Sequence, residues 1–290
     1  LAYSRYTSRT SLWSMPMPAN PPVSSTGATR VTNANEFIES LTISSDGKWL
    51  YYDSNLPGNA DLFRVPAAGG DPEQLTTDPA DDFAPEPSPD GREIVFHSWR
   101  SGNRDIYVMR LDGGGVQQLT HTPRIQEGLA RWSPDGQALA FTQIASPFGI
   151  WVMRRDKNGQ WGEPKLRRAD GFFPLWSSDG KSIAFSGSIF GGVLEIMPAD
   201  SGPAHPIAKA RGELAWMVWP KNGPIYYSAH DSRGNASIWS ISTDGKPARL
   251  LVTLDPLIHQ SLRSVMAFGN GRIYFSAEDR ESDIWVMETR

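Results

Sequence analysis

A four-residue motif, Ser-x-Asp-Gly, recurs along the chain at an almost constant interval. Its copies begin at Ser44, Ser88, Ser133 and Ser177, which lie 44 or 45 residues apart. A shorter form continues the series at Asn222-Gly223 and Asn270-Gly271. Asp-Gly and Asn-Gly between apolar runs are strong signals for a hairpin, because the turn needs residues that tolerate positive φ. The chain is therefore expected to repeat one hairpin-containing unit.

Each turn is followed by two short segments rich in aromatic and aliphatic residues, separated by a polar loop. The first set is expected to form strands at residues 1–6, 49–54, 93–98, 138–143, 182–187, 225–228 and 272–276. The second set is expected at residues 12–15, 61–65, 105–109, 149–153, 193–197, 237–241 and 283–287. Four strands in about every 40–45 residues are typical of a propeller blade. Seven copies predict an all-β, seven-bladed β-propeller with four-stranded blades.

The repeat covers the whole chain, so we expect one propeller domain over residues 1–290. Its blades are expected at approximately 1–34, 35–78, 79–123, 124–168, 169–209, 210–254 and 255–290. The first and last blades are incomplete in this scheme, because each has only three predicted strands. We therefore expect the chain to be the tail of a longer protein. The alternative is a propeller that tolerates two three-stranded blades.

Composition excludes several classes of protein. The chain has 11 Trp, 27 Gly and 23 Pro, which suits many short strands, and it has no Cys. Disulfides, thiolate metal sites and a cysteine nucleophile are therefore excluded. The net charge of −4 offers no basic field, so no nucleic-acid partner is expected. The sequence has no long apolar run, so we expect no membrane insertion by this domain.

Tryptophans and aspartates recur at matching positions of the repeat. Trp132 and Trp176 precede equivalent turns. The third strands carry Phe63, Tyr107, Trp151, Trp239 and Trp285 at one position. We expect these side chains to pack between blades. Asp61, Asp105 and Asp283 begin third strands, and we expect them to accept backbone N–H bonds from the preceding loop rather than to bind metal.

The fullest repeat, DGREIVFHSWRSGNRDIYVM at residues 90–109, resembles TolB-like, WD40-like propeller repeats. The resemblance extends over essentially the whole chain and is specific for fold. It is much less specific for function. Such blades occur in periplasmic TolB, in the gating propellers of prolyl-oligopeptidase-like enzymes and in sensor regions of bacterial kinases and transcription regulators.

No catalytic motif is found, so we expect no catalytic residues and no enzyme activity. The sequence lacks a Gly-x-Ser-x-Gly elbow, a Walker loop and a His-Glu-x-x-His helix. The five histidines show no metal-ligand spacing.

Charged and aromatic residues are found in the segments that enter the innermost strands, which form one rim of a propeller. We expect ligand-binding residues there: Glu39, Asp81, Asp82, Arg124, Glu127, Phe172, Arg211, Glu213 and Arg263. The partner would be a protein or a small ligand. No cofactor is expected, although calcium near Asp81 and Asp82 is an alternative.

The leading hypothesis is a non-enzymatic binding or sensing propeller, the C-terminal part of a larger bacterial signalling protein. One alternative is a free periplasmic TolB-like scaffold for protein interactions. Another is the gating propeller of a prolyl-oligopeptidase-like hydrolase. The resemblance implies an extracytoplasmic or periplasmic location, and we expect a monomer.

Overall fold

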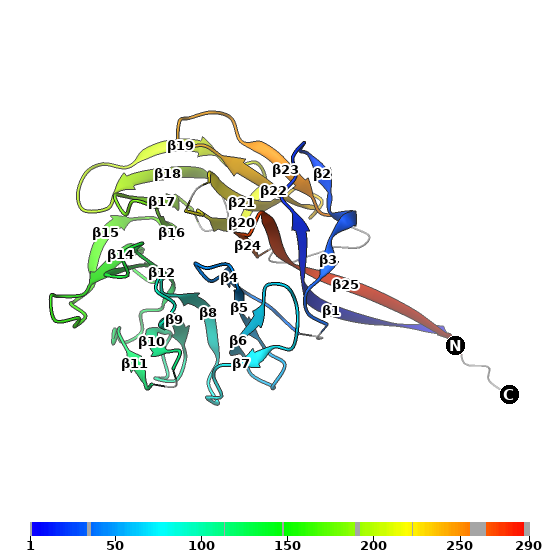
Figure 1. Cartoon of the computed structure of the whole chain (residues 1–290), viewed down its shortest axis with the longest axis horizontal. Helices are drawn as coiled ribbons and strands as arrows, with labels where there is room; N and C mark the ends of the chain where they lie inside the picture. Colours follow the sequence, from blue (N-terminus) through cyan, green and yellow to red (C-terminus); the bar gives the residue numbers. More distant parts are fainter. Residues whose placement is uncertain are drawn as a thin grey trace.

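Antiparallel sheets are arranged around a common centre in the computed structural model (Figure 1). The structure describes residues 2–33, 36–112, 114–146, 148–188, 192–221, 223–255 and 265–286, with backbone only for 2–9 and 279–286. Within these residues there are six sheets. Each contains four antiparallel strands, ordered from the centre of the disc to its edge. The fold is therefore an all-β propeller, as predicted, but with six blades rather than seven.

Five blades are continuous in sequence. Blade one contains β4 (Leu41–Ile43), β5 (Trp49–Ser54), β6 (Asp61–Pro66) and β7 (Glu73–Gln74). Blade two contains β8 (Asp82–Pro87), β9 (Glu93–Ser98), β10 (Asp105–Arg110) and β11 (Val116–Gln118). Blade three contains β12 (Glu127–Trp132), β13 (Ala138–Gln143), β14 (Gly149–Arg154) and β15 (Lys165–Ala169).

Blade four contains β16 (Phe172–Trp176), β17 (Ser182–Ser186), β18 (Val193–Pro198) and β19 (His205–Lys209). Blade five contains β20 (Glu213–Val218), β21 (Ile225–His230), β22 (Ala236–Ile241) and β23 (Arg249–Thr253). A fifth strand, β2 (Val23–Ser24), joins blade five by pairing parallel with β23, and the short 3-10 helix η1 (Ser25–Gly27) follows it.

Blade six is assembled from both ends of the described chain. Its order is β24 (Met266–Gly269), β25 (Arg272–Val286), β1 (Ala2–Pro16) and β3 (Thr29–Arg30). β1 and β25 pair antiparallel from Ala2↔Val286 to Pro16↔Arg272, and together they extend beyond the disc in Figure 1. The blades predicted at 1–34 and 255–290 are therefore two halves of one blade. The ring closes without the two strands that the sequence analysis expects to be missing.

The predicted number of blades was wrong for a physical reason. Residues 7–11 and 277–282 are polar, which suggests loops that divide the flanking apolar segments into separate strands. In the structure both segments are extended and pair with each other, for example at Thr7↔Glu281 and Arg9↔Asp279. Each apparent pair of strands is therefore one 15-residue strand. These two polar segments form strands by pairing with each other. Neither therefore shows an alternating apolar and polar pattern that would predict a strand from its own sequence.

The Ser-x-Asp-Gly motif forms the predicted turn between the first two strands of blades one to four. In the first copy, Ser44 Oγ donates to Asp46 Oδ1 (2.6 Å), and the backbone N–H of Lys48 donates to the same oxygen (3.0 Å). The N–H of Trp49 donates to Ser44 Oγ (3.0 Å), and Gly47 adopts a φ of 73°. The hydrogen bond from the serine lowers the pKa of the aspartate in all four copies. The hydrogen bonds of the turn therefore explain why Ser and Asp recur at these positions.

Two tryptophans join neighbouring blades, as predicted. Trp132 Nε1 donates to the carbonyl of Glu86 (3.0 Å), and Trp176 Nε1 donates to the carbonyl of Arg131 (3.1 Å). Both indoles are buried, and each bond reaches the first strand of the preceding blade. Phe63 and Tyr107 are likewise buried, and Trp151 and Trp239 are partly buried in the cores. The side chain of Trp285 lies outside the described residues.

Polar side chains of the second strands also reach the next blade. Asp53 accepts the N–H of Ala84 (3.0 Å), and Thr142 accepts the N–H of Phe173 (3.2 Å). Ala84 and Phe173 have positive φ, and the strand pairing is irregular at both points. Burial raises the pKa of Asp53 to about 6, and its hydrogen bonds oppose that rise. These bonds fix the start of each inner strand against the preceding blade.

Replacement of either inter-blade tryptophan should destabilise the ring strongly. Trp132→Ala and Trp176→Ala each remove a buried indole and leave a cavity, which costs about 3–5 kcal/mol. Thermal melting of the purified chain should show a clear drop for each. Trp99→Ala, at a tryptophan that is 37% exposed, is the matched control. Melting of Trp132→Ala or Trp176→Ala at the control temperature would contradict the inter-blade role.

Candidate functional site

One face of the disc carries most of the connections that could bind a partner. The segment that enters each first strand and the connection between second and third strands lie at the same end of an antiparallel sheet. We call this end the loop face. Its described segments are residues 36–40, 55–60, 78–81, 99–104, 123–126, 144–146, 148, 170–171, 187–188, 192, 210–212 and 231–235. The eight predicted site residues that the structure describes belong to this end of the blades or border it.

A pair of asparagines clamps neighbouring segments of the loop face together. Asn59 Nδ2 donates to the carbonyls of Asp78 (3.0 Å) and Ala80 (3.3 Å) at the entry to blade two. Asn103 Nδ2 donates in the same way to the carbonyls of Thr122 (3.0 Å) and Ile125 (2.7 Å) at the entry to blade three. The sequence analysis missed both residues. Their signal is the repeated Gly-Asn-x-Asp string at 58–61 and 102–105.

The aspartate of that string has a structural role, but not through the bonds expected. Asp61 accepts hydrogen bonds from Thr76 Oγ1 (3.0 Å) and Gln74 Nε2 (3.1 Å). Asp105 accepts from Gln118 Nε2 (2.9 Å) and Asn103 Nδ2 (3.1 Å). Side chains of the fourth strand and its extension, together with Asn103 of the preceding loop, therefore replace the expected backbone N–H donors. The side chain of Asp283 lies outside the described residues.

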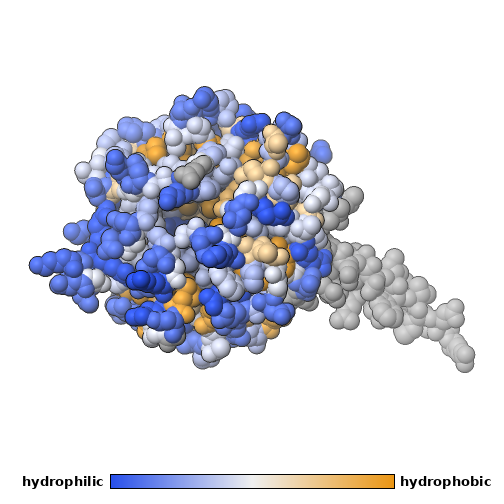
Figure 2. Space-filling view, viewed as in Figure 1, coloured by the Kyte–Doolittle hydropathy of each residue, from blue (hydrophilic) through white to orange (hydrophobic). Residues whose placement is uncertain are grey.

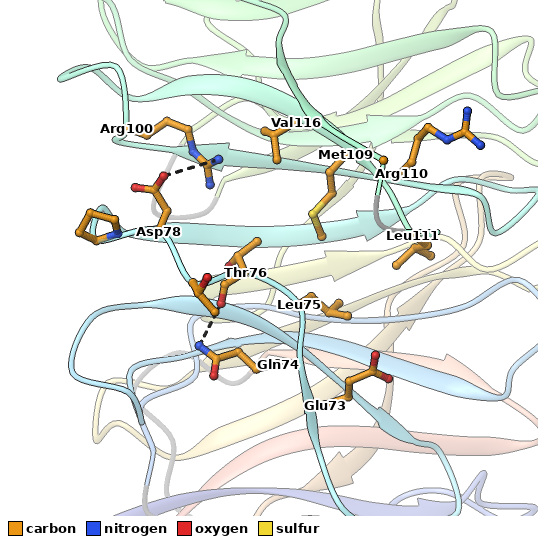
Figure 3. Close-up of a pocket in the computed structure, with 13 residues that line it drawn as sticks. Glu73, Gln74, Leu75, Thr76, Asp78, Arg100, Met109, Arg110, Leu111 and Val116 are labelled. Atoms are coloured by element: carbon orange, nitrogen blue, oxygen red, sulfur yellow. Dashed lines mark hydrogen bonds and ion pairs between the residues drawn. The ribbon is translucent and has the colours of Figure 1, made fainter.

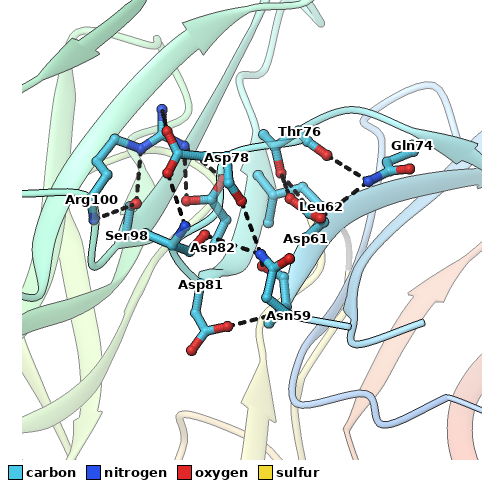
Figure 4. A network of polar contacts seen from close by, with 12 residues as sticks. Asn59, Asp61, Leu62, Gln74, Thr76, Asp78, Asp81, Asp82, Ser98 and Arg100 are labelled. Carbon is cyan, nitrogen blue, oxygen red and sulfur yellow. Dashed lines mark hydrogen bonds and ion pairs between the residues drawn. The ribbon is translucent and has the colours of Figure 1, made fainter. Parts of the chain in front are cut away.

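Asp82 and Arg100 form the centre of a charged network between blades one and two (Figure 4). Arg100 Nη2 lies 2.9 Å and 2.7 Å from the two carboxylate oxygens of Asp82, whose side chain is fully buried. Arg100 also lies 3.8 Å from Asp78 and over the rings of Phe96 and Tyr107. Burial raises the pKa of Asp82, and the bonds from Ser98 and Arg100 oppose that rise.

Glu127 occupies the position of Asp82 in blade three, as the first residue of its inner strand. It is also buried, and Thr120 and Thr122 supply hydroxyl groups to its carboxylate. Burial raises the pKa of Glu127 to about 8, and the nearby carboxylate of Asp105 adds to the rise. Glu127 is therefore protonated at neutral pH.

The predicted site residues divide into two groups. Asp82 and Glu127 are buried, Asp82 in its pair with Arg100 of the same blade and Glu127 beside Thr120, so neither side chain lies on the exposed rim. The others are spread over several blades rather than gathered in one cluster. Arg124, Arg211 and Glu213 are exposed, whereas Glu39, Asp81 and Phe172 are half-buried. Arg263 lies outside the described residues.

Calcium at Asp81 and Asp82 stays a prediction. The two carboxylates already have separate protein partners, because Asp81 Oδ1 accepts the N–H of Ala60 (2.9 Å) and Asp82 binds Arg100. Among the described residues, no three His, Asp or Glu side chains are grouped so that they could hold a metal ion.

Large apolar side chains are exposed on the loop face, and the sequence analysis did not single them out. The described ones, with their exposed fractions, are Phe37 (41%), Leu56 (57%), Trp99 (37%), Phe148 (46%) and Val193 (41%). They belong to blades one to four and lie in, or next to, the connections defined above. Val116 and Leu166 are also exposed but lie on outer strands. Apolar side chains gathered on loops with charged neighbours are typical of an interaction surface.

Clefts lie between the outer strands of neighbouring blades. The cleft between blades one and two has a volume of about 560 Å³. Figure 3 shows Asp78 and Arg100 at one end of it, Arg110 towards the other, and Leu75, Met109 and Leu111 along its wall. The clefts between blades three and four and between blades six and one measure about 450 and 610 Å³. In the view of Figure 2, hydrophilic residues cover most of the surface and apolar patches lie between them.

The comparisons with known proteins agree with this architecture. The family model described as the TolB β-propeller domain matches residues 22–163. A putative TolB from Agrobacterium tumefaciens has a TM-score of 0.72 and 20% identity, with 93% of this chain and 98% of that chain covered. The chain has the fold of the TolB-like β-propellers. No curated protein sequence matches it closely enough to count as a relative.

Two further solved structures are similar to this TolB-like propeller. TolB from Acinetobacter baumannii has a TM-score of 0.63 and 20% identity, with 94% of this chain and 65% of that chain covered. The β-propeller domain of the trilobed protease from Pyrococcus furiosus, described as having an open velcro topology, has a TM-score of 0.54 and 11% identity over 87% of this chain and 96% of that chain. In the described chain, no helix has the length and apolar character needed to cross a membrane.

The Asp82–Arg100 pair gives a test of the inter-blade network. Arg100→Met leaves a buried carboxylate without its counter-charge, which should cost about 3–5 kcal/mol in the free energy of unfolding. Urea unfolding should show most of this loss restored in the double variant Asp82→Asn/Arg100→Met. Arg110→Met breaks the exposed pair with Asp112, which solvent screens, and should lower stability far less. Equal losses for Arg100→Met and Arg110→Met would refute the central role of the buried pair.

Glu127 should make stability depend on pH. The unfolded carboxyl ionises near its ordinary pKa of 4.5, whereas the folded one keeps its proton until about pH 8. Its contribution to stability is therefore fully present below pH 4.5 and is lost as the pH rises to about 8. The melting temperature of Glu127→Gln, relative to that of the unmodified chain, should be higher at pH 9 than at pH 5. Glu213→Gln, at the exposed first residue of β20, is the control, and the same gain there would contradict the assignment.

Proposed function

We propose that this TolB-like propeller is a non-enzymatic protein-binding module that binds its partner through the loop face. The supporting observation is the set of exposed apolar side chains on that face, among them Phe37, Leu56 and Trp99. The charged residues Arg124, Arg211 and Glu213 are exposed on the same face. An open face that carries both exposed aromatic side chains and charged residues suits a protein partner better than a small enclosed ligand.

The geometry of the face supports a rigid binding surface. Asn59 and Asn103 each tie the connection of one blade to the entry of the next. The N–H of Phe37 donates to Asn55 Oδ1 (2.8 Å), which joins the two apolar-bearing segments of blade one. A surface held in this way loses little conformational entropy when a partner binds.

The likeness to TolB structures supports an extracytoplasmic location and a role as an interaction scaffold. The expected attachment to a signalling module rested mainly on two strands missing from the ring. β1 completes the sixth blade, so that gap does not exist and no longer supports the attachment. The structure of the protease propeller shows that similar folds also accompany hydrolases, and an assay for peptide hydrolysis tests that alternative.

Binding should depend on the apolar residues of the loop face. The chain, immobilised in one orientation, would be exposed to bacterial envelope extract, and the captured proteins identified by mass spectrometry. Trp99→Ser/Phe148→Ser should reduce capture of the main partner about tenfold or more, as expected for hot-spot aromatics. Val116→Ser, at an equally exposed residue on β11, should leave it unchanged. Equal capture by all three proteins, or peptide hydrolysis that survives repurification, would refute the proposal.

A further inference from the structure

The outer strand of blade three presents an open edge. β15 is the last strand in the order β12-β13-β14-β15, and in the described chain no further strand pairs with it. Its residues are exposed or half-buried along its whole length. An edge strand offers a row of unpaired N–H and C=O groups that can pair with an added strand. β15 therefore has the backbone groups needed to accept another chain.

The protein itself shows that such an edge can be occupied. In blade five, β2 pairs parallel with the outer strand β23 through Val23↔Val252 and Ser24↔Thr253. The outer strands β7 and β11 have only two and three residues, which limits strand addition. β19 has five residues but contains Pro206, which cannot donate a backbone hydrogen bond. β15 is thus a five-residue edge without proline and without an added strand in the described chain.

The charge of this edge selects its partner. β15 carries Lys165, Arg167 and Arg168, although the chain as a whole has a net charge of −4. Arg168 already pairs with Glu195 (3.4 Å), so Lys165 and Arg167 supply the charge open to a partner. Arg167 donates to the carbonyls of Pro198 (2.6 Å) and Ala199 (3.1 Å), so its side chain bridges to blade four while its charge stays at the edge. A second copy of the same basic edge would be repelled. An acidic strand would be attracted.

A cleft with an apolar wall lies beside the same edge. The cleft, of about 450 Å³ between blades three and four, has Val152, Leu166 and Ala199 along this wall. Its charged lining residues are Glu163, Lys165, Arg167 and the ion pair of Arg154 with Asp200 (2.8 Å). Val152 and Ala199 are buried, whereas Leu166 is 44% exposed. One apolar side chain of an added strand would cover Leu166 and fill part of this space.

We propose that β15 is a second interaction site, which takes an extended acidic segment of a partner protein by strand addition. Backbone hydrogen bonds to the edge provide the docking, Lys165 and Arg167 pair with the acidic side chains, and Leu166 receives an apolar one. This site is separate from the loop face and does not depend on the function proposed for it.

A short labelled peptide tests the proposal on the whole chain. Acetylated and amidated Glu-Val-Glu-Val-Glu carries alternating acidic and apolar side chains, and its binding would be measured by fluorescence anisotropy at low salt. Lys165→Glu and Leu166→Asp should each weaken binding about tenfold or more. Val116→Asp, at the matching exposed residue of β11, should leave the affinity unchanged. All these residues are exposed, and circular dichroism would verify that each variant folds.

Two control peptides separate strand addition from simple charge attraction. The same peptide N-methylated at every residue keeps its charges but loses all its backbone donors, so it should not bind measurably. Lys-Val-Lys-Val-Lys should not bind either. The proposal is overturned if the acidic peptide does not bind, if N-methylation has no effect, or if Val116→Asp weakens binding as much as Leu166→Asp.

Discussion

The pairing of β1 with β25 is the constraint on which the rest of the molecule depends. Two strands from opposite ends of the sequence share one blade, and their backbone hydrogen bonds close the ring. Closure fixes the number of blades, and that number sets the angle at which each blade meets the next. The position of every connection on the loop face follows from this angle. A strand pair that no local sequence pattern specifies therefore governs the geometry of the binding surface.

Within the closed ring, short polar contacts join the successive blades one to four. Trp132 and Trp176 donate indole N–H bonds across the blade boundary, while Asp53 and Thr142 accept backbone N–H bonds at the start of the following inner strand. Asn59 and Asn103 do the same on the loop face. The apolar cores supply most of the stabilisation. The polar contacts, being directional, fix the relative placement of the blades.

The sequence was most informative where the structural signal was local. The Ser-x-Asp-Gly turns, the strands that follow them and the packing of Trp132 are all confirmed, because each depends on residues within one repeat. The number of blades was wrong because the polar segments at 7–11 and 277–282 form strands only by pairing with each other. Within the site, the sequence analysis placed Asp82 and Glu127 on the exposed rim, because no local pattern shows that the folded chain buries them. Trp99 and Phe148 were overlooked for the converse reason, because an aromatic residue in a repeat resembles core.

The composite sixth blade also has a consequence for how the molecule is made. During synthesis β1 emerges before the five intervening blades, and its partner β25 emerges only after those blades have been translated. Over that interval β1 has an unsatisfied edge, and the growing protein is an open arc with exposed faces at both ends. Contacts this distant in sequence form late and slowly. The last step of folding is therefore the meeting of the two ends, and until it occurs the nascent arc is the species most prone to aggregate or to bind a chaperone.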